Sequence, residues 1–353
     1  MSVTSSLRRA TGRSTPLSLA DRLFSTGEDR RTARVIEEGI ETLEARLGAE
    51  THFSGGLVDV VARYLLEAGG KRVRPILAFL TAQLGDGITD EVITAAASIE
   101  LTHLASLYHD DVMDDADQRR GVPSAQYVWG NSIAILTGDL LFARASALLA
   151  LLGERAIRLQ ADTFERLCLG QLKETLGPAE GENQVDHYIA VLADKTGSLI
   201  AASAQLGIIF SNAPAAFEEP VRVFGEKVGI AFQLVDDVLD IAPSADDTGK
   251  TPGTDIRAGV ATLPVLYLRQ LAATDPDAAA LLARIQPDEL ASAAPDDSDE
   301  AIRLLREHPV TRRTVEEAHR YAREAIAALD PLPSGTVKKT LVRFAETVVE
   351  RTS

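Results

Sequence analysis

Apolar residues recur at helical spacing along almost the whole chain, in stretches of roughly ten to twenty-five residues separated by short Gly, Pro or Asp segments. The sequence lacks convincing runs of alternating apolar and polar residues, which would indicate strands. Aromatic residues make up only 5% of the chain, and Ala, Leu, Glu and Arg are abundant, which favours helix over sheet. The sequence therefore predicts an all-α fold.

The periodic stretches give a set of expected helices. They cover Thr32–Leu47, Leu57–Ala68, Arg74–Leu84, Asp90–Met113, Asn131–Leu152, Ile157–Leu176, Val185–Ser211, Pro220–Ile241, Leu263–Ala273, Asp299–Glu307 and Val310–Leu329, with one more closing near Val349.

The chain is expected to form one domain, residues 31–353, after a mobile N-terminal tail, residues 1–30. The tail is polar and mildly basic, and no apolar segment of signal-peptide length comes after it. Residues 274–298 are rich in Ala, Asp and Pro, and they predict an acidic, mobile excursion from the domain. The remaining residues, 299–353, are too few to form a second enzyme.

Composition excludes several classes of protein. A net charge of −16 argues against broad nucleic-acid binding, which needs an excess of Lys and Arg. Cys168 is the single cysteine, so the chain has no disulfide framework, and a reducing, cytoplasmic compartment is expected. The longest uncharged run, 196–217, contains several polar residues and Pro214, which favours a buried helix over a transmembrane segment.

Two acidic clusters of the same design interrupt apolar helical runs, DDVMD at residues 110–114 and DDVLD at residues 236–240. On a helix, residues four apart share a face, so the first and last carboxylates of each cluster stack, at a cost of roughly 0.2–0.5 kcal/mol per pair. A cation between the clusters would relieve this repulsion. Hard oxygen ligands without His or Cys spacing select Mg²⁺, with Mn²⁺ as a substitute, and Mg²⁺ commonly completes its shell with substrate phosphate.

Cations gather where a phosphorylated substrate would need them. The run GGKRVRP, residues 69–75, places three cations at a helix start, and Arg119 and Arg120 lie just after the first acidic cluster. Lys195 and Lys250 are two more isolated cations near apolar helices. The alternative is that these are ordinary surface residues near loops.

The ordered series of motifs resembles the trans-type isoprenyl diphosphate synthases, in particular the bacterial all-trans polyprenyl diphosphate synthases. The resemblance runs from about Arg34 to Arg351 and rests on GGKRVRP, ELTH at 100–103, HDDVMDDADQRRG at 109–121, and DDVLD. Shorter matches lie between and after these: Gly138-Asp139, Gly170-Gln171, Lys195-Thr196-Gly197, Ala231-Phe232-Gln233, and Gly249-Lys250 reaching Asp255.

The resemblance implies an antiparallel helix bundle of the isoprenoid synthase type around a deep central cavity. It also implies a prenyltransferase that extends an allylic diphosphate with isopentenyl diphosphate, with three Mg²⁺ ions in the active site. The implied metal ligands are Asp110, Asp111, Asp114, Asp236, Asp237 and Asp240, and all of these except Asp240, together with Lys195, are the implied catalytic residues. The allylic substrate would be held by Arg119, Lys195, Thr196, Gln233 and Lys250, and isopentenyl diphosphate by Lys71, Arg74, His103 and Arg120.

One position departs from the family pattern, because Val260 stands where the family commonly has Lys. Arg257, one turn earlier, is a possible substitute for the missing cation. Ala105 and Ser106, one helical turn before Asp110, are small, whereas short-chain members of the family have bulky aromatic residues there. The implied product is longer than twenty carbons, about thirty to fifty.

A homodimer is also implied, and a long prenyl product would have to leave the enzyme toward a membrane, by transient contact, or toward a protein acceptor. Long products suggest a quinone side chain or a carrier-lipid precursor. The alternatives are a farnesyl or geranylgeranyl diphosphate synthase, a class I terpene cyclase, which would not need an isopentenyl diphosphate pocket, and a non-catalytic partner subunit, in which eroded carboxylates would be expected.

Overall fold

The computed structural model describes residues 30–53, 55–242 and 252–352. The predicted tail, residues 1–30, lies outside these ranges except for Arg30, which begins the first helix. Lys250 also lies outside the described residues.

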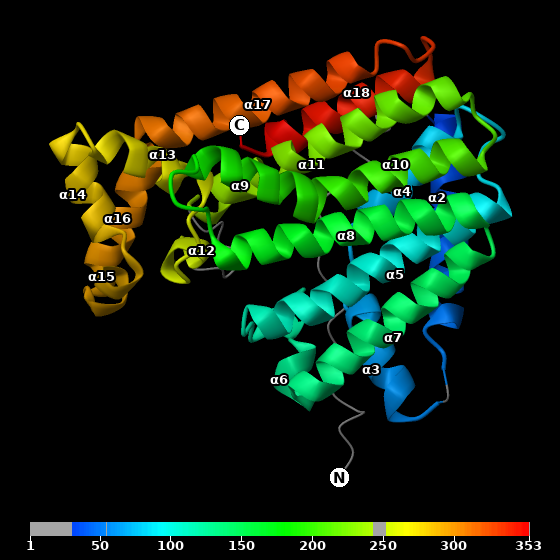
Figure 1. The fold of residues 1–353 in the computed structure, drawn as a ribbon, viewed down its shortest axis with the longest axis horizontal. Coiled ribbons are helices and arrows are strands. Elements are labelled where there is room, and N and C mark those ends of the chain that lie inside the picture. Colours follow the sequence, from blue (N-terminus) through cyan, green and yellow to red (C-terminus); the bar gives the residue numbers. More distant parts are fainter. Residues whose placement is uncertain (1–29, 54, 243–251, 353) are drawn as a thin grey trace.

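The described chain is almost entirely helical, which confirms the predicted fold class (Figure 1). The helices are α2 (Arg30–Glu50), α3 (Leu57–Glu67), α4 (Val73–Ala82), α5 (Asp90–Met113), α6 (Ala125–Trp129), α7 (Asn131–Ala150), α8 (Glu154–Leu176), α9 (Gln184–Leu192), α10 (Ser198–Phe210), α11 (Glu218–Asp240), α12 (Thr254–Arg257), α13 (Leu263–Ala272), α14 (Pro276–Arg284), α15 (Pro287–Ser292), α16 (Pro295–Glu307), α17 (Pro309–Ala328) and α18 (Thr336–Val349). Short 3₁₀ turns cover Ala215–Phe217 and Glu350–Thr352.

The centre of the bundle is α5, which packs against α2, α4, α7 and α10. Because neighbours surround it, α5 is apolar around most of its circumference, as expected of a helix buried on several sides. Thr89 begins the helix, and its side chain accepts a hydrogen bond from the backbone N–H of Val92 at 3.2 Å. On the other side of α10, α11 packs along α17 (Figure 1).

The uncharged run 196–217 contains α10, most of which is buried, as the sequence predicted. The single helix expected over Val185–Ser211 is instead interrupted. A π-helical turn, Ala193–Gly197, joins α9 to α10. Gly229 of α11 packs directly on this turn, and a Cβ atom at Gly229 would lie 2.7 Å from the Cα of Gly197. Glycine at both positions therefore lets α11 approach the π turn closely.

The expectation of a mobile excursion over residues 274–298 is wrong, because this segment forms α14, α15 and the start of α16. These helices make a small lobe at one end of the bundle (Figure 1). Pro276, Pro287 and Pro295 each occupy the first helical position, where the missing N–H costs nothing. Asp275 caps α14 through the N–H groups of Asp277 and Ala278. The Pro and Asp residues that suggested a linker are helix-start signals.

Strands are limited, within the described ranges, to a two-residue hairpin, β1 (Gln118–Arg119) paired antiparallel with β2 (Val122–Pro123). The hairpin comes just after the first acidic cluster and turns through Arg120 and Gly121, both with positive φ. One described helix, α7, is long and apolar enough to cross a membrane by length and composition, and 39% of its apolar window is buried inside the fold.

Candidate active site

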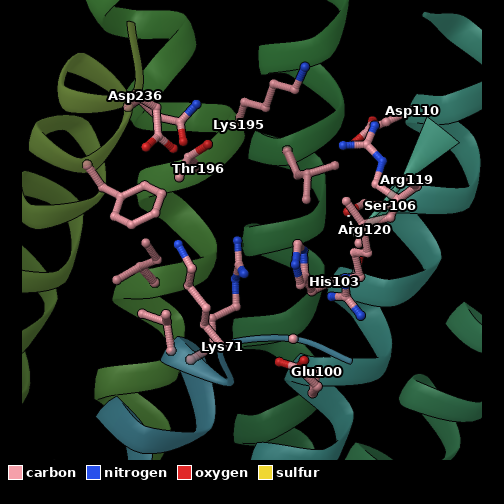
Figure 2. A pocket seen from close by; sticks show the side chains of 18 of the residues that line it. Lys71, Glu100, His103, Ser106, Asp110, Arg119, Arg120, Lys195, Thr196 and Asp236 are labelled. Carbon is pink, nitrogen blue, oxygen red and sulfur yellow. Dashed lines mark hydrogen bonds between the residues drawn. The ribbon is translucent and has the colours of Figure 1, made fainter. Parts of the chain in front are cut away.

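A cavity of about 510 Å³ lies between the α4–α5 side and the α10–α11 side of the bundle (Figure 2). Most of the site residues expected from the sequence line it: Lys71, Arg74, His103, Ser106, Asp110, Asp114, Arg119, Arg120, Lys195, Thr196, Gln233 and Asp236. Four others, Ala105, Asp111, Asp237 and Asp240, are not among the lining residues.

The first acidic cluster ends α5 and presents Asp110 and Asp114 to the cavity. Burial raises the pKa of Asp110 to about 6, with Lys195 acting against the shift and Asp114 adding to it. Asp111 is fully buried behind them, and its Oδ1 accepts a hydrogen bond from Nε of Arg119 at 2.6 Å. The β1–β2 hairpin brings Arg119 back to this position.

The second acidic cluster ends α11 and presents only Asp236 to the cavity. Asp237 is buried: both of its oxygens accept hydrogen bonds from the Tyr188 hydroxyl, at 2.9 and 2.8 Å, and Oδ2 also accepts one from the N–H of Leu263 at 3.1 Å. Burial raises the pKa of Asp237 to about 8, and these hydrogen bonds oppose the shift. Oδ2 of Asp240 accepts from the N–H of Asp255 at 3.2 Å.

Arg351, near the C-terminus, contacts the same cluster, although no sequence motif pointed to it. Its Nη1 lies 3.1 Å from Oδ1 of Asp236, and its guanidinium lies over the ring of Phe232, 5.0 Å from the centroid. Because Arg351 and Asp236 are far apart in the sequence, no local pattern could have revealed this contact.

Lys195 and Thr196 reach the cavity from the π turn. In Figure 2 they lie between Asp236 on one side and Asp110 on the other. Nζ of Lys195 donates to Oε2 of Glu174 on α8 at 2.5 Å. Gly170 brings α8 this close, because a Cβ atom there would lie 2.7 Å from the backbone N of Lys195. Glu174 does not line the cavity, but it pairs with a residue that does, and the sequence reasoning did not anticipate this contact.

The other end of the cavity is cationic. Lys71, Arg74, His103 and Arg120 line it, and His103 lies beside Arg120 (Figure 2). Burial lowers the pKa of Arg74 to about 10, with Glu100 opposing the shift. Burial, together with the neighbouring arginines, lowers the pKa of His103 well below its usual range, so this imidazole is neutral.

Arg72 is more buried than Lys71 and Arg74, and it is paired with two carboxylates. It adopts a left-handed backbone conformation, with φ of 48°, just before α4. Its guanidinium donates to Oε1 of Glu100 at 2.9 Å and to Oε2 of Glu44 at 3.2 Å. The charge of Arg72 is therefore already matched by two carboxylates of the fold, although the residue also lines the cavity.

The two residues expected to control chain length occupy different environments. Ser106 lines the cavity, whereas Ala105 is fully buried in the core next to it. Tyr108 points away, because its hydroxyl contacts the backbone of Val61 and Leu65 on α3.

The suggestion that Arg257 replaces the cation missing at Val260 is not supported. The guanidinium of Arg257 donates to Oγ of Ser298 at 3.3 Å and to Oδ1 of Asp299 at 3.0 Å, both on α16. It is not among the residues that line the cavity.

The donor set suits a hard cation shared with a phosphate group. Within the described residues, no group of three His, Cys, Asp or Glu side chains is placed to hold a metal ion by itself. Mg²⁺ bound by few carboxylates normally takes its other ligands from water and phosphate. The buried atoms without hydrogen-bond partners in the described part of the chain include Oδ2 of Asp111 and Nε of Arg74. A cation near the first and an anion near the second would satisfy both.

Comparison with known proteins agrees with this geometry. The polyprenyl synthetase family model matches residues 56–303. A nonaprenyl diphosphate synthase from Mycobacterium tuberculosis is 41% identical over 90% of this chain and 94% of the relative. The crystal structure of a decaprenyl diphosphate synthase from Rhodobacter capsulatus superposes with a TM-score of 0.81 at 30% identity, over 92% of this chain and 99% of that one.

A geranylgeranyl pyrophosphate synthase from Corynebacterium glutamicum, solved with calcium and isoprenyl diphosphate, superposes with a TM-score of 0.78 at 37% identity. The match covers 92% of this chain and 98% of that one. The likeness thus extends over nearly the full length of each protein. The chain belongs to the polyprenyl synthetase family and is a prenyltransferase.

Proposed function

We propose that this chain is an all-trans polyprenyl diphosphate synthase that adds isopentenyl diphosphate units to an allylic diphosphate in an Mg²⁺-dependent reaction. The observation that carries the proposal is the division of the cavity. Carboxylates of Asp110, Asp114 and Asp236 face it at one end, and the Lys71, Arg74 and Arg120 cations line the other. A single space can therefore receive a metal-bound diphosphate and a second, metal-free diphosphate.

Asp110, Asp114 and Asp236 would hold the metal ions, three in number, with Asp111, Asp237 and Asp240 orienting them. Bound Mg²⁺ would neutralise the charge that develops on the leaving diphosphate. Arg119, Lys195, Thr196, Gln233 and Lys250 would hold the allylic diphosphate, and the cations among them would stabilise it more strongly as it departs.

Isopentenyl diphosphate would be bound by Lys71, Arg74, His103 and Arg120. His103 would contact the diphosphate by a hydrogen bond, and no proton transfer is assigned to it. Leu107, Ile200 and Phe232 line the same cavity, and their apolar surfaces would exclude water from the allylic cation. The released pyrophosphate would then accept the proton lost after condensation.

The product is proposed to be longer than twenty carbons, because Ser106 leaves open the cavity wall one turn before Asp110. Ser106→Phe should shorten the product by closing that wall. Ala105→Phe should also shorten it if Ala105 borders the path of the growing chain, and unchanged product length would remove Ala105 from that path. Product sizes after dephosphorylation measure both effects.

A cytoplasmic homodimer is proposed, with transient membrane contact for product release. The supporting observation is that α7 and α8 carry exposed apolar side chains, among them Leu136, which is 64% exposed, and Leu172, which is 55% exposed. Burying these side chains against a second copy would remove them from water. A sedimentation measurement on the full chain tests the dimer.

The function is tested by supplying Mg²⁺, labelled isopentenyl diphosphate and primers of five to twenty carbons in turn, then sizing the products. Extension of a primer to long polyprenyl diphosphates is expected. Ionisation of the primer without incorporation of label would indicate a cyclase, and activity only with an added subunit would indicate a partner protein. No release of pyrophosphate under any of these conditions would contradict the proposal.

A further inference from the structure

Tyr188 and Asp237 form a buried contact, and the proposed reaction gives Tyr188 no role. Tyr188 lies on α9, seven residues before Lys195, and its hydroxyl donates to both carboxylate oxygens of Asp237. Asp237 is 6% exposed and is absent from the cavity lining, so it does not face the substrates directly.

The position of this contact links the two segments that carry reactive groups on the α11 side. α9, the π turn and α10 are continuous, so Tyr188 moves with Lys195 and Thr196. Asp237 comes directly after Asp236 on α11, and consecutive helical residues point about 100° apart. Holding the Asp237 side chain in one direction therefore fixes the direction in which Asp236 points.

The second acceptor role of Asp237 strengthens this link. Its Oδ2 also accepts the N–H of Leu263, the first residue of α13. One carboxylate thus joins α9, α11 and α13, and a buried, fully hydrogen-bonded polar group permits only a narrow range of arrangements. An apolar pair could pack the same helices together, but it would allow them to slide.

We propose that Tyr188 is a positioning residue that acts through Asp237 to fix Asp236 relative to Lys195 and Thr196. It would thereby set the binding geometry of the metal-bound allylic diphosphate. This inference rests on the proposed function of the cavity. It concerns only one side of the cavity, because no described contact ties Tyr188 to Lys71, Arg74 or His103.

The test is Tyr188→Phe in the full-length chain, which removes the hydroxyl and keeps the ring. The Michaelis constant for the allylic substrate and the Mg²⁺ concentration for half-maximal activity should both rise about tenfold. The Michaelis constant for isopentenyl diphosphate should stay within twofold. The matched control is Tyr267→Phe, the same change at a buried tyrosine outside the cavity, and all three constants should be unaffected.

A binding measurement makes the test independent of turnover. Mg²⁺ with inorganic pyrophosphate should raise the melting temperature of the unmodified chain, and Tyr188→Phe should reduce that rise while leaving the melting temperature of the free protein within a few degrees. An equal rise in both variants would overturn the proposal, as would equal changes in the constants for the two substrates.

Asp237→Asn alone covers the case in which Tyr188→Phe folds poorly, and where both variants fold, a double-mutant cycle shows whether they act through one contact. Asp237→Asn keeps the shape of the side chain but weakens its acceptor capacity, so it should raise the allylic constant selectively. The double variant should be little worse than either single one, because both act through one contact. Additive effects would contradict the inference. If the unmodified chain extends no primer, the proposed function fails, whereas an active chain with an unaffected Tyr188→Phe variant refutes the positioning role alone.

Discussion

The two acidic clusters share a five-residue pattern but are built into the fold differently. The C-terminal end of α5, with the first acidic cluster, forms one wall of the cavity, called here the α5 wall. Asp110 and Asp114 face the cavity there, and Asp111 accepts a hydrogen bond from the Arg119 side chain. The C-terminal end of α11, with the second acidic cluster, forms the opposite wall, called here the α11 wall. Asp236 is the one carboxylate of this cluster that lines the cavity. Asp237 and Asp240 instead accept hydrogen bonds from backbone N–H groups later in the chain. The difference arises because the chain returns as a hairpin after the first cluster and as helix starts after the second.

The two walls thus differ in whether their carboxylates face the cavity or hold helices together. The α5 wall offers two carboxylates at little structural cost, whereas the α11 wall uses Asp237 and Asp240 to fasten α9, α12 and α13 to α11. The shared sequence motif therefore predicts where carboxylates cluster, but it does not predict which group each carboxylate contacts. The two walls should respond differently to substitution.

The largest effect is expected where the walls are alike. Asp110→Asn and Asp236→Asn should each lower kcat/KM by about 10³-fold, because each removes a charged ligand from the site of diphosphate departure. Incorporation of labelled isopentenyl diphosphate measures the loss. Asp288→Asn, an exposed residue of α15, should have no effect. If either variant kept kcat/KM within tenfold of the unmodified chain, the two clusters would not contribute equally to catalysis.

The walls should differ most clearly in stability. Asp237→Ala leaves the Tyr188 hydroxyl and the Leu263 N–H without their acceptor, so the free energy of unfolding should fall by about 2–4 kcal/mol. Asp114→Ala, at an exposed position, should change it by less than about 0.5 kcal/mol. Urea unfolding without metal gives both values. Similar losses in the two variants would mean that both clusters are structural.

His103 provides a pH test of the α5 wall. Its pKa in the folded chain is far below the usual value, chiefly through burial. The unfolded chain therefore binds a proton below about pH 6.5 that the folded chain does not, and stability falls as the pH decreases. Between pH 7.5 and 5.5 the unmodified chain should lose about 1 kcal/mol more than His103→Gln. Parallel pH profiles of urea unfolding would show that His103 titrates normally.

The smallest effect is expected beyond the α11 wall. Arg257→Ala should leave the Michaelis constant for the allylic substrate within twofold, because this guanidinium binds Ser298 and Asp299 and does not line the cavity. Steady-state kinetics with a varied primer test this. A rise of several fold would make Arg257 the substitute for the cation missing at Val260.

Local signals in the sequence predicted most helices and both acidic clusters, because helical periodicity and like-charge spacing act over a few residues. Contacts between distant residues were not predictable: Tyr188 and Asp237 are 49 positions apart. Arg72 could not be told from Lys71 and Arg74, since its burial depends on Glu44 and Glu100, each 28 positions away.

The helices of residues 274–298 were not predicted for a different reason. The Pro and Asp residues of this segment carry two meanings, linker composition and helix initiation, and only the spacing of apolar residues between them distinguishes the two. In α14 and α16 the buried residues Ala278, Leu281, Ile302 and Leu305 pack into the core, and this packing favours helix.

The π turn at Ala193–Gly197 makes the site depend on residue count as well as residue identity. A π turn amounts to one extra residue in an α-helix. Deleting one residue there would leave an ordinary helix, but it would rotate everything beyond it by about 100° relative to α9. The extra residue of the π turn thus decides which side chains of this segment, Lys195 and Thr196, are presented to the cavity.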